Sequence, residues 1–367
     1  MNQYGRSKAG KDSGRVSQMQ RENIKSRVEK IRSRLGRKKI GWLVVTKPAN
    51  VTYITGFSGD DSWAVIGPKR VYLLTDSRYS EQAKDECVGC RIIERKGALA
   101  EAAGKLTKRM KTGAVAVEES ASIGDLKSIR KNVEVGCRTV GGIIESIRSV
   151  KDEEEVVAIR TAARLAAKAV ERMRSKIRAG LTENELAGML EWEIRQQGGE
   201  AAFETIVAFG SNASRPHHRP TDRRLRKNDT ILVDFGVRYG GYCCDVTRCF
   251  VVGQATAYYK KIYEAVKEAQ QAAIRMVRAG VKASAVDAAA REAIKRQGLP
   301  VYGHGTGHGL GLEVHEQPTV SWLNKGKLRA GEVITIEPGV YIPGRMGVRI
   351  EDNILVTEGG CEVLTLC

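Results

Sequence analysis

Hydrophobic positions in the first third of the chain switch between helical and strand-like spacing, which predicts an α/β domain. Residues 17–35 carry an aliphatic residue at every third or fourth position, as an amphipathic helix does. Short aliphatic runs bounded by turn-forming residues are typical of strands. Strands are predicted at residues 40–45, 63–66 and 71–74, with further helices near residues 80–86 and 99–111. A linker is expected around residues 140–152.

The rest of the chain contains one pattern twice, about 100 residues apart. Each copy has a long amphipathic helix that ends at an Arg-Ala-Gly triplet and a second helix that ends at a Gln-Gly pair. Two strands around a turn then follow. The first copy has helices at residues 153–177 and 182–197, and the spacing of Thr182 and Glu185 matches a capping box. The second copy has a helix at residues 257–277 and another that ends near residue 297.

The first pair of strands, residues 231–251, contains two acidic residues in an otherwise apolar setting. If the turn is centred on Tyr239 and Gly240, Asp234 lies opposite Asp245, with Cβ atoms roughly 5 Å apart. Aspartate is uncommon in strands, and two like charges facing each other repel. We therefore expect a cation between these carboxylates.

The second pair of strands, residues 333–355, repeats the arrangement. Folding this hairpin about Gly344 sets Glu337 opposite Glu351. Four carboxylates from two hairpins, with a nearby histidine, form a ligand set for two divalent cations. Oxygen donors with one imidazole suit manganese, cobalt or zinc. The alternative is that these acids are edge charges or salt-bridge partners, which is harder to reconcile with two matched pairs.

All of the histidines lie in the second half of the chain, and a site role is expected for at least three of them. Glycines surround two of them in residues 303–311, where they allow close backbone approach. This stretch lacks the G-x-G-x-x-G spacing of a dinucleotide site. The five histidines are His217, His218, His304, His308 and His315.

Composition narrows the remaining classes of function. The formal charge of +18 suggests nucleic-acid binding, but residues 1–39 alone hold thirteen Lys or Arg against three acids. Residues 1–16 are predicted to be a disordered basic tail, and no RNA-binding motif accompanies the charge, so specific nucleic-acid binding is not expected. The eight scattered cysteines favour free thiols in a reducing cytoplasm. Neither a secretory signal nor a membrane-spanning run is apparent.

Several motifs together resemble the pita-bread metallopeptidases, and most closely their prolidase and aminopeptidase P branch. The resemblance covers about residues 21–367 and includes residues 50–56 and 74–79, which look like the creatinase-type N-terminal domain. It implies an α/β (α+β) chain with an N-terminal domain at residues 17–145, a pita-bread domain at residues 150–367 with an internal pseudo-twofold repeat, and a homodimer. The motifs are Asp234 with Asp245 eleven residues later, Gly305-Thr306-Gly307-His308-Gly309, Val314-His315-Glu316, Ile336-Glu337-Pro338-Gly339 and Arg349-Ile350-Glu351-Asp352.

The resemblance also implies a role for individual residues. Asp245 and Glu351 would bridge two metal ions, Asp234 would complete one site, and His308 and Glu337 the other. Mn²⁺ is the expected ion, with Co²⁺ or Zn²⁺ as alternatives, and a hydroxide between the ions would be the nucleophile. The catalytic residues implied are His217, His315 and Glu337, and the substrate-binding residues are His304, Tyr341 and Arg349; His218 stays open.

The expected activity is hydrolysis of the Xaa-Pro bond at the N-terminus of dipeptides or short peptides. The residues do not distinguish a prolidase, which cleaves dipeptides, from an aminopeptidase P, which cleaves longer peptides. One rival is a non-catalytic pita-bread protein that binds nucleic acid or a protein through its basic surface. Another is a creatinase-like enzyme without metal. The five ligand residues favour neither rival.

Overall fold

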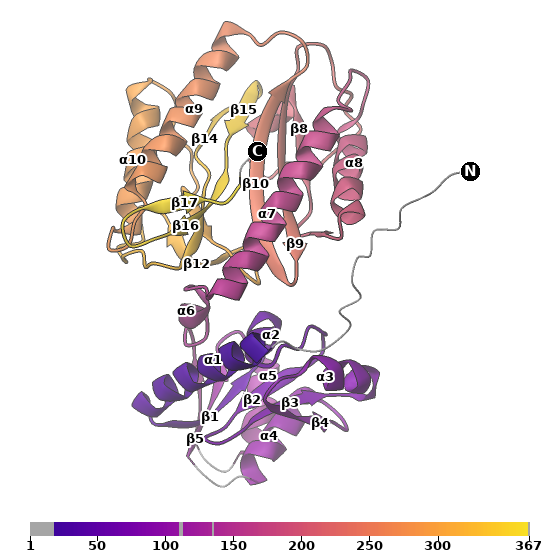
Figure 1. Cartoon of the computed structure of the whole chain (residues 1–367), viewed down its shortest axis with the longest axis vertical. Helices are drawn as coiled ribbons and strands as arrows, with labels where there is room; N and C mark the ends of the chain where they lie inside the picture. Colours follow the sequence, from indigo (N-terminus) through magenta and orange to yellow (C-terminus); the bar gives the residue numbers. More distant parts are fainter. Residues whose placement is uncertain (1–17, 110–112, 134–135, 366–367) are drawn as a thin grey trace, which may run out of the picture. The chain divides into compact units, whose positions relative to one another are not determined.

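The computed structural model describes residues 18–109, 113–133 and 136–365 (Figure 1). Its chain separates into two compact units, the first ending at Ile147 and the second beginning at Arg148. The basic tail predicted for residues 1–16 lies outside the described residues.

The first unit is built around one mixed β-sheet. In its described part the strand order is β4-β3-β2-β1-β5-β6, with β1 antiparallel to β2 and parallel to β5. The hydrophobic face predicted for the first helix is buried in α1. The elements are α1 (Gln18–Arg37), β1 (Ile40–Val45), α2 (Pro48–Thr55), β2 (Trp63–Ile66), β3 (Val71–Thr75), α3 (Ser80–Glu86), β4 (Cys90–Glu94), α4 (Leu99–Arg109), β5 (Ala114–Glu118), α5 (Ile123–Lys131) and β6 (Cys137–Val140), followed by α6 (Glu145–Arg148).

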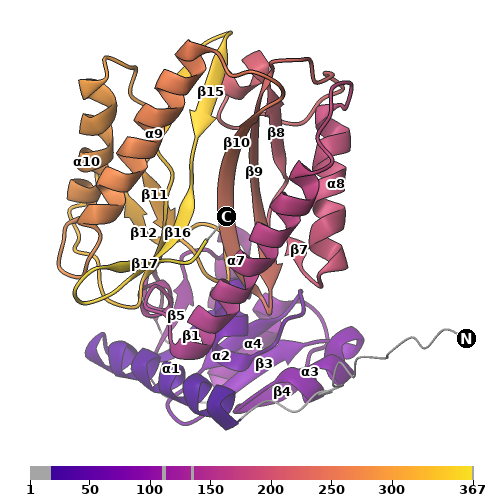
Figure 2. The ribbon, with the colours of Figure 1, turned by 45° about the horizontal axis from the view of Figure 1, so that its top comes forward.

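The second unit confirms the predicted repeat of two helices followed by a hairpin. The helix pair α7 and α8 and the helix pair α9 and α10 flank the strands (Figures 1 and 2). Thr182 and Glu185 form the predicted capping box at the start of α8. The elements are α7 (Glu153–Arg174), α8 (Glu183–Gln196), β7 (Glu200–Ala201), β8 (Ile206–Phe209), β9 (Thr230–Tyr239), β10 (Tyr242–Val251), α9 (Ala257–Met276), α10 (Ala283–Arg296), β11 (Gly307–Gly309), β12 (Glu316–Val320), β13 (Val333–Ile336), β14 (Gly339–Ile342), β15 (Met346–Arg349), β16 (Asp352–Val356) and β17 (Cys361–Val363).

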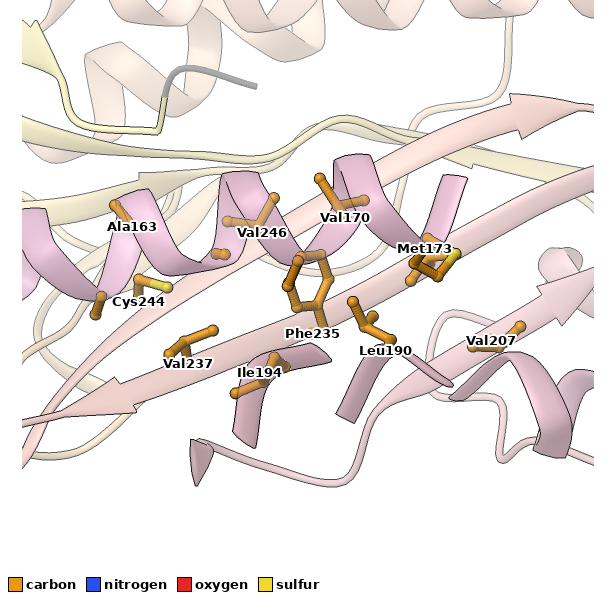
Figure 3. Packing of buried hydrophobic residues seen from close by; sticks show 14 of the residues in the cluster. Ala163, Val170, Met173, Leu190, Ile194, Val207, Phe235, Val237, Cys244 and Val246 are labelled. Atoms are coloured by element: carbon orange, nitrogen blue, oxygen red, sulfur yellow. The ribbon is translucent and has the colours of Figure 1, made fainter. Parts of the chain in front are cut away.

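Helices α7 and α8 pack on the long hairpin through a closely packed apolar cluster. Figure 3 shows Phe235 of β9 between Val170 of α7 and Leu190 of α8. Phe235 and Leu190 have no exposed surface, and burying each such side chain contributes roughly 2 kcal/mol. This packing fixes which face of β9 is turned away from the helices, and Asp234 lies on that face because side chains alternate along a strand.

The register of the first hairpin differs from the prediction. Asp234 pairs with Thr247, and Asp245 pairs with Gly236, so the two acids are diagonal neighbours and do not lie directly opposite each other. The turn residues are Gly240 and Gly241, with φ of 56° and 83°. A two-residue hairpin turn of this kind needs positive φ at both positions, which two glycines supply and Tyr239 would not. Because the shift is two residues, both carboxylates stay on one face.

The second hairpin has the predicted register, but its strands are interrupted at the acids. Ile336 pairs with Asp352 on one side of the interruption and Gly339 pairs with Arg349 on the other. That register places Glu337 across from Glu351. Strands β13 and β16 belong to a larger sheet, whereas β14 and β15 form a separate ladder. Within the described residues, no helix combines the length and apolar character needed to cross a membrane.

Candidate metal centre

A pocket of about 310 Å³ in the second unit brings together residues from both repeats. Its acidic side chains come from β9, β10 and the interrupted second hairpin, and its imidazoles come from three loops or short strands. Tyr341 is absent from its lining. The predicted site residues that line it are Asp234, Asp245, His308, Glu337, Glu351, His217, His304, His315 and Arg349.

Three of the predicted ligands are close enough to share one ion. One ligand atom each of Asp245, His308 and Glu351 lies within 4.8 Å of the others. His308 Nε2 is 3.7 Å from Asp245 Oδ2 and 3.4 Å from Glu337 Oε1. Strand β10 of the first hairpin packs against β15 and β16 of the second, so the two predicted acid pairs face one pocket.

The imidazole of His308 turns a lone pair towards these acids. Its Nδ1 lies 3.1 Å from the carbonyl oxygen of Gly309, which can only accept a hydrogen bond, so Nδ1 carries the proton. Burial lowers the pKa of His308, which favours the neutral ring. Nε2 then presents a lone pair to carboxylate oxygens, an arrangement that is repulsive unless a cation or a proton lies between them.

Within the part of the chain that the structure describes, two carboxylate oxygens in the pocket lack a hydrogen-bond partner. Asp234 pairs through Oδ2 with Arg349, yet among the described residues neither Asp234 Oδ1 nor Asp245 Oδ1 has a hydrogen-bond partner. Both residues are buried, and a buried charged oxygen without a partner is costly. Such oxygens are what a divalent cation would satisfy.

Crowding disfavours the ionised form of these acids. Burial raises the pKa of Asp245, and repulsion from Glu351, Asp234 and Glu337 raises it further. Burial and the repulsion of Glu337 and Asp234 likewise raise the pKa of Glu351. Burial raises the pKa of Glu337 to about 7, although Arg349 opposes the shift. One arginine is too little positive charge for four acids, so the donor set fits divalent cations.

A chain of hydrogen bonds connects Arg349 with another pocket loop. Arg349 Nη1 donates to Tyr341 Oη at 2.8 Å, and Tyr341 Oη lies 3.1 Å from His304 Nε2. His304 Nδ1 lies 2.7 Å from the carbonyl oxygen of Gly305, so Nδ1 donates and Nε2 accepts the Tyr341 hydroxyl proton. Burial lowers the pKa of His304 to about 4. Tyr341 thus contacts the site through two pocket residues.

The remaining histidines separate into lining and supporting positions. His315 packs edge-to-face on His308, with ring centroids 4.3 Å apart. His217 is exposed and lines the pocket, whereas its neighbour His218 is buried and lies 2.9 Å from Glu183 Oε2. The question left open for His218 is therefore answered: it does not line the pocket.

Several supporting residues were missed by the sequence analysis. Thr247 donates to Glu351 Oε2 at 2.7 Å and accepts from Arg349 Nε at 3.0 Å. The side chain of Asn353 pairs with both the N–H and the carbonyl of Asp245, at 3.0 and 2.5 Å. Asp287 accepts the Thr306 N–H and hydroxyl beside the His308 strand. The sequence offered one indication of these residues: Thr247 and Asn353 each lie two positions from a predicted ligand.

Comparison with known proteins defines the class. Residues 157–358 match metallopeptidase family M24, and residues 27–150 match the creatinase/prolidase N-terminal domain. The chain belongs to metallopeptidase family M24. This confirms the resemblance and the fold, a creatinase-type N-terminal domain followed by a pita-bread domain.

Three individual proteins are similar to this chain over most of their length. The uncharacterized peptidase YqhT of Bacillus subtilis is 36% identical, over 92% of this chain and 97% of the relative. The Xaa-Pro dipeptidase from Bacillus anthracis is 33% identical with a TM-score of 0.91, covering 94% of this chain and 98% of that one. The X-Pro aminopeptidase from Thermotoga maritima MSB8 is 35% identical with a TM-score of 0.83, covering 91% of this chain and 98% of that one.

Proposed function

We propose that this chain hydrolyses the bond between an N-terminal residue and the proline that follows it, in dipeptides or short peptides. The observation that carries the proposal is the pocket that holds four acids and the imidazole of His308. Two of these acids, Asp234 and Asp245, each have a buried oxygen without a hydrogen-bond partner among the described residues. The similarity to an Xaa-Pro dipeptidase from Bacillus anthracis and an X-Pro aminopeptidase from Thermotoga maritima MSB8 supports the substrate class. An imide bond before proline has no N–H, so it requires a dedicated site.

The proposed metal ligands are the five predicted residues. Asp245 and Glu351 would bridge two divalent cations, with Asp234 completing one site and His308 and Glu337 the other. Mn²⁺ suits this oxygen-rich set with one imidazole, and Co²⁺ or Zn²⁺ could replace it. When bound, the two cations polarise the scissile carbonyl and lower the pKa of water to about 7.

Glu337 is proposed to hold and release a proton during the reaction. In the metal-free pocket, burial raises the pKa of its carboxyl group to about 7. A bound cation would lower that pKa, so the proposed role rests on the place of Glu337 in the pocket, beside the proposed ligand His308. Burial lowers the pKa of His315, so its neutral ring can donate a hydrogen bond to the carbonyl oxygen as that oxygen gains negative charge. His217 lies on the same pocket and is proposed to contact the substrate.

Arg349, Tyr341 and His304 are proposed to orient the substrate. The guanidinium of Arg349 is a planar donor suited to a carboxylate, such as that of a C-terminal proline. Its hydrogen bond to Tyr341, and that of Tyr341 to His304, hold the three groups in one arrangement.

The proposal is tested by assaying purified protein with Mn²⁺, Co²⁺ or Zn²⁺ on Ala-Pro, Gly-Pro and Ala-Pro-Ala, with Ala-Ala as the control. Cleavage of either proline substrate class and two metal equivalents per chain are expected. Comparison of the dipeptides with the tripeptide assigns the chain to the prolidase or the aminopeptidase P activity. A preparation that binds no metal and leaves all proline peptides intact would falsify the proposal and favour a non-catalytic binding protein.

We extend the proposal to a homodimer in a reducing cytoplasm. None of the cysteines within the described residues forms a disulfide, as is typical of proteins from reducing compartments. Light scattering of the purified protein measures the oligomeric state, and localisation of a tagged chain tests the compartment.

A further inference from the structure

The second unit contains a fully buried carboxylate that the proposed reaction does not use. Glu183 is the first residue of α8 and has no exposed surface. Each of its oxygens receives hydrogen bonds from one loop, residues 209–221. Oε1 accepts from Phe209 N–H at 2.7 Å and Asn212 Nδ2 at 2.8 Å, and Oε2 accepts from Thr221 N–H at 3.0 Å, Thr221 Oγ1 at 2.6 Å and His218 Nε2 at 2.9 Å.

These contacts keep Glu183 ionised inside the protein. Burial alone would raise its pKa, but the hydrogen bonds from His218, Thr221, Asn212 and Phe209 lower the pKa below its usual value. A buried anion is stable only when such donors surround it, so the loop must wrap around the carboxylate. The conformation of the loop is therefore coupled to one side chain on α8.

The same loop carries His217, whose imidazole lines the metal pocket. His217 is exposed at the pocket, whereas the next residue, His218, is 5% exposed and turned towards Glu183. The N–H of His218 also donates to the carbonyl of Arg215 at 3.2 Å, which closes a turn around Pro216 and His217. Because neighbouring side chains leave the backbone in different directions, fixing His218 inward sets the position of His217 at the pocket.

We propose that Glu183 is a positioning residue that acts through His218 to hold His217 in place for the substrate. It touches neither the substrate pocket nor the proposed metal ligands, so its effect on catalysis passes through the loop. This inference rests on the proposed function, because it assigns Glu183 a part in the reaction of that pocket.

A double-mutant cycle tests the coupling. Glu183→Gln keeps the size of the side chain but turns an NH₂ group towards donors, and we expect kcat/KM for Ala-Pro to fall by about 10- to 100-fold with two metal equivalents retained. In a His217→Ala background the same substitution is expected to cost no more than about threefold, because the side chain that it positions is gone. Independent, multiplicative losses would overturn the inference.

A glutamate at the other end of the same helix supplies the control. Glu193 is 7% exposed and pairs with Lys176 at 2.5 Å and Arg172 at 3.4 Å, away from residues 209–221. Glu193→Gln is expected to change kcat/KM by less than about twofold, since it leaves the loop intact. A loss equal to that of Glu183→Gln would assign both effects to the stability of α8 and overturn the proposal.

Hydrogen exchange separates this inference from the proposed function. Glu183→Gln should speed amide exchange in residues 209–221 and leave β10 unchanged, whether or not proline peptides are cleaved. Faster exchange in a chain that cleaves none of the proline peptides would show that Glu183 holds the loop and would reject the peptidase proposal. Normal cleavage by the wild-type chain, with unchanged exchange in the variant, would reject only the positioning role of Glu183.

Discussion

Two groups of buried acids in the second unit differ in how their charge is balanced. Glu183 receives a full set of hydrogen bonds, and Glu316 pairs with Arg148 and Lys151. The pocket acids share Arg349, and oxygens of Asp234 and Asp245 have no partner among the described residues.

The pKa shifts of the two groups have opposite signs. Burial would raise the pKa of Glu316, but Lys151 and Arg148 lower it, whereas burial and neighbouring acids raise the pKa values of Asp245 and Glu351. A buried acid that the protein itself neutralises supports the fold. A buried acid left without a partner marks a place where something else must bind.

The largest effect on activity is expected when an acid of the metal pocket is replaced by its amide. Asp245→Asn should reduce kcat/KM by about a thousandfold or more, because a proposed bridging ligand is lost. The same change should raise the Tm of the metal-free protein by a few degrees, because one repelling charge is removed. Activity assays and calorimetry in a chelator measure the two effects. A metal-free Tm that falls instead would contradict the assignment of these acids as mutually repelling.

The same type of substitution at an acid that the protein itself neutralises, such as Glu316, should lower the free energy of unfolding. Glu316→Gln removes the carboxylate that Arg148 and Lys151 share, and it leaves Arg148 with Glu313 at 3.2 Å. We expect a loss of about 2 kcal/mol in the free energy of unfolding, less than for a buried pair that is broken completely. Because the folded pKa of Glu316 is lowered, this stabilisation is present above the usual pKa and is lost as pH falls through the folded value. Urea unfolding should therefore show the difference shrinking in acid, and a constant difference would argue against the pairing.

Much of this contrast could be predicted from the sequence, and the limits have physical causes. Asp234 and Asp245 stand out because acids are rare in apolar strands. Glu183 resembles an ordinary first-turn acid beside a capping box, and nothing local reveals that a loop some 30 residues later folds over it. The hairpin register was misjudged by two residues because the turn depended on which glycines took positive φ.

The pH dependence of the metal-free protein sharpens the same comparison. The folded-state pKa of Glu337 is raised to about 7, so near neutrality the folded protein binds more protons than the unfolded chain. This stability is complete below the usual pKa of about 4 and is lost as pH rises through the folded pKa. Urea unfolding in a chelator should show a decline of about 2–3 kcal/mol from pH 5 to pH 8, and Mn²⁺ should reverse the slope. A free energy of unfolding that rises with pH in the chelator would contradict the raised pKa of Glu337.

The smallest effect is expected at the turn of the first hairpin, formed by Gly240 and Gly241. Gly240 has φ of 56°, and a Cβ there would meet no atom within 4 Å. Gly240→Ala should therefore cost about 1 kcal/mol of backbone strain and leave metal content and kcat/KM unchanged. A change in metal content would mean that the turn, and not strand packing, sets the positions of Asp234 and Asp245.

The repeat has a consequence for synthesis of the chain. Asp234 and Asp245 come from the first copy, while His308, Glu337 and Glu351 come from the second. A nascent chain that has emerged from the ribosome only as far as α9 holds two of the five proposed ligands. Because the cations would need donors from both copies, peptidase activity can arise only after the second copy has been made and has folded onto the first.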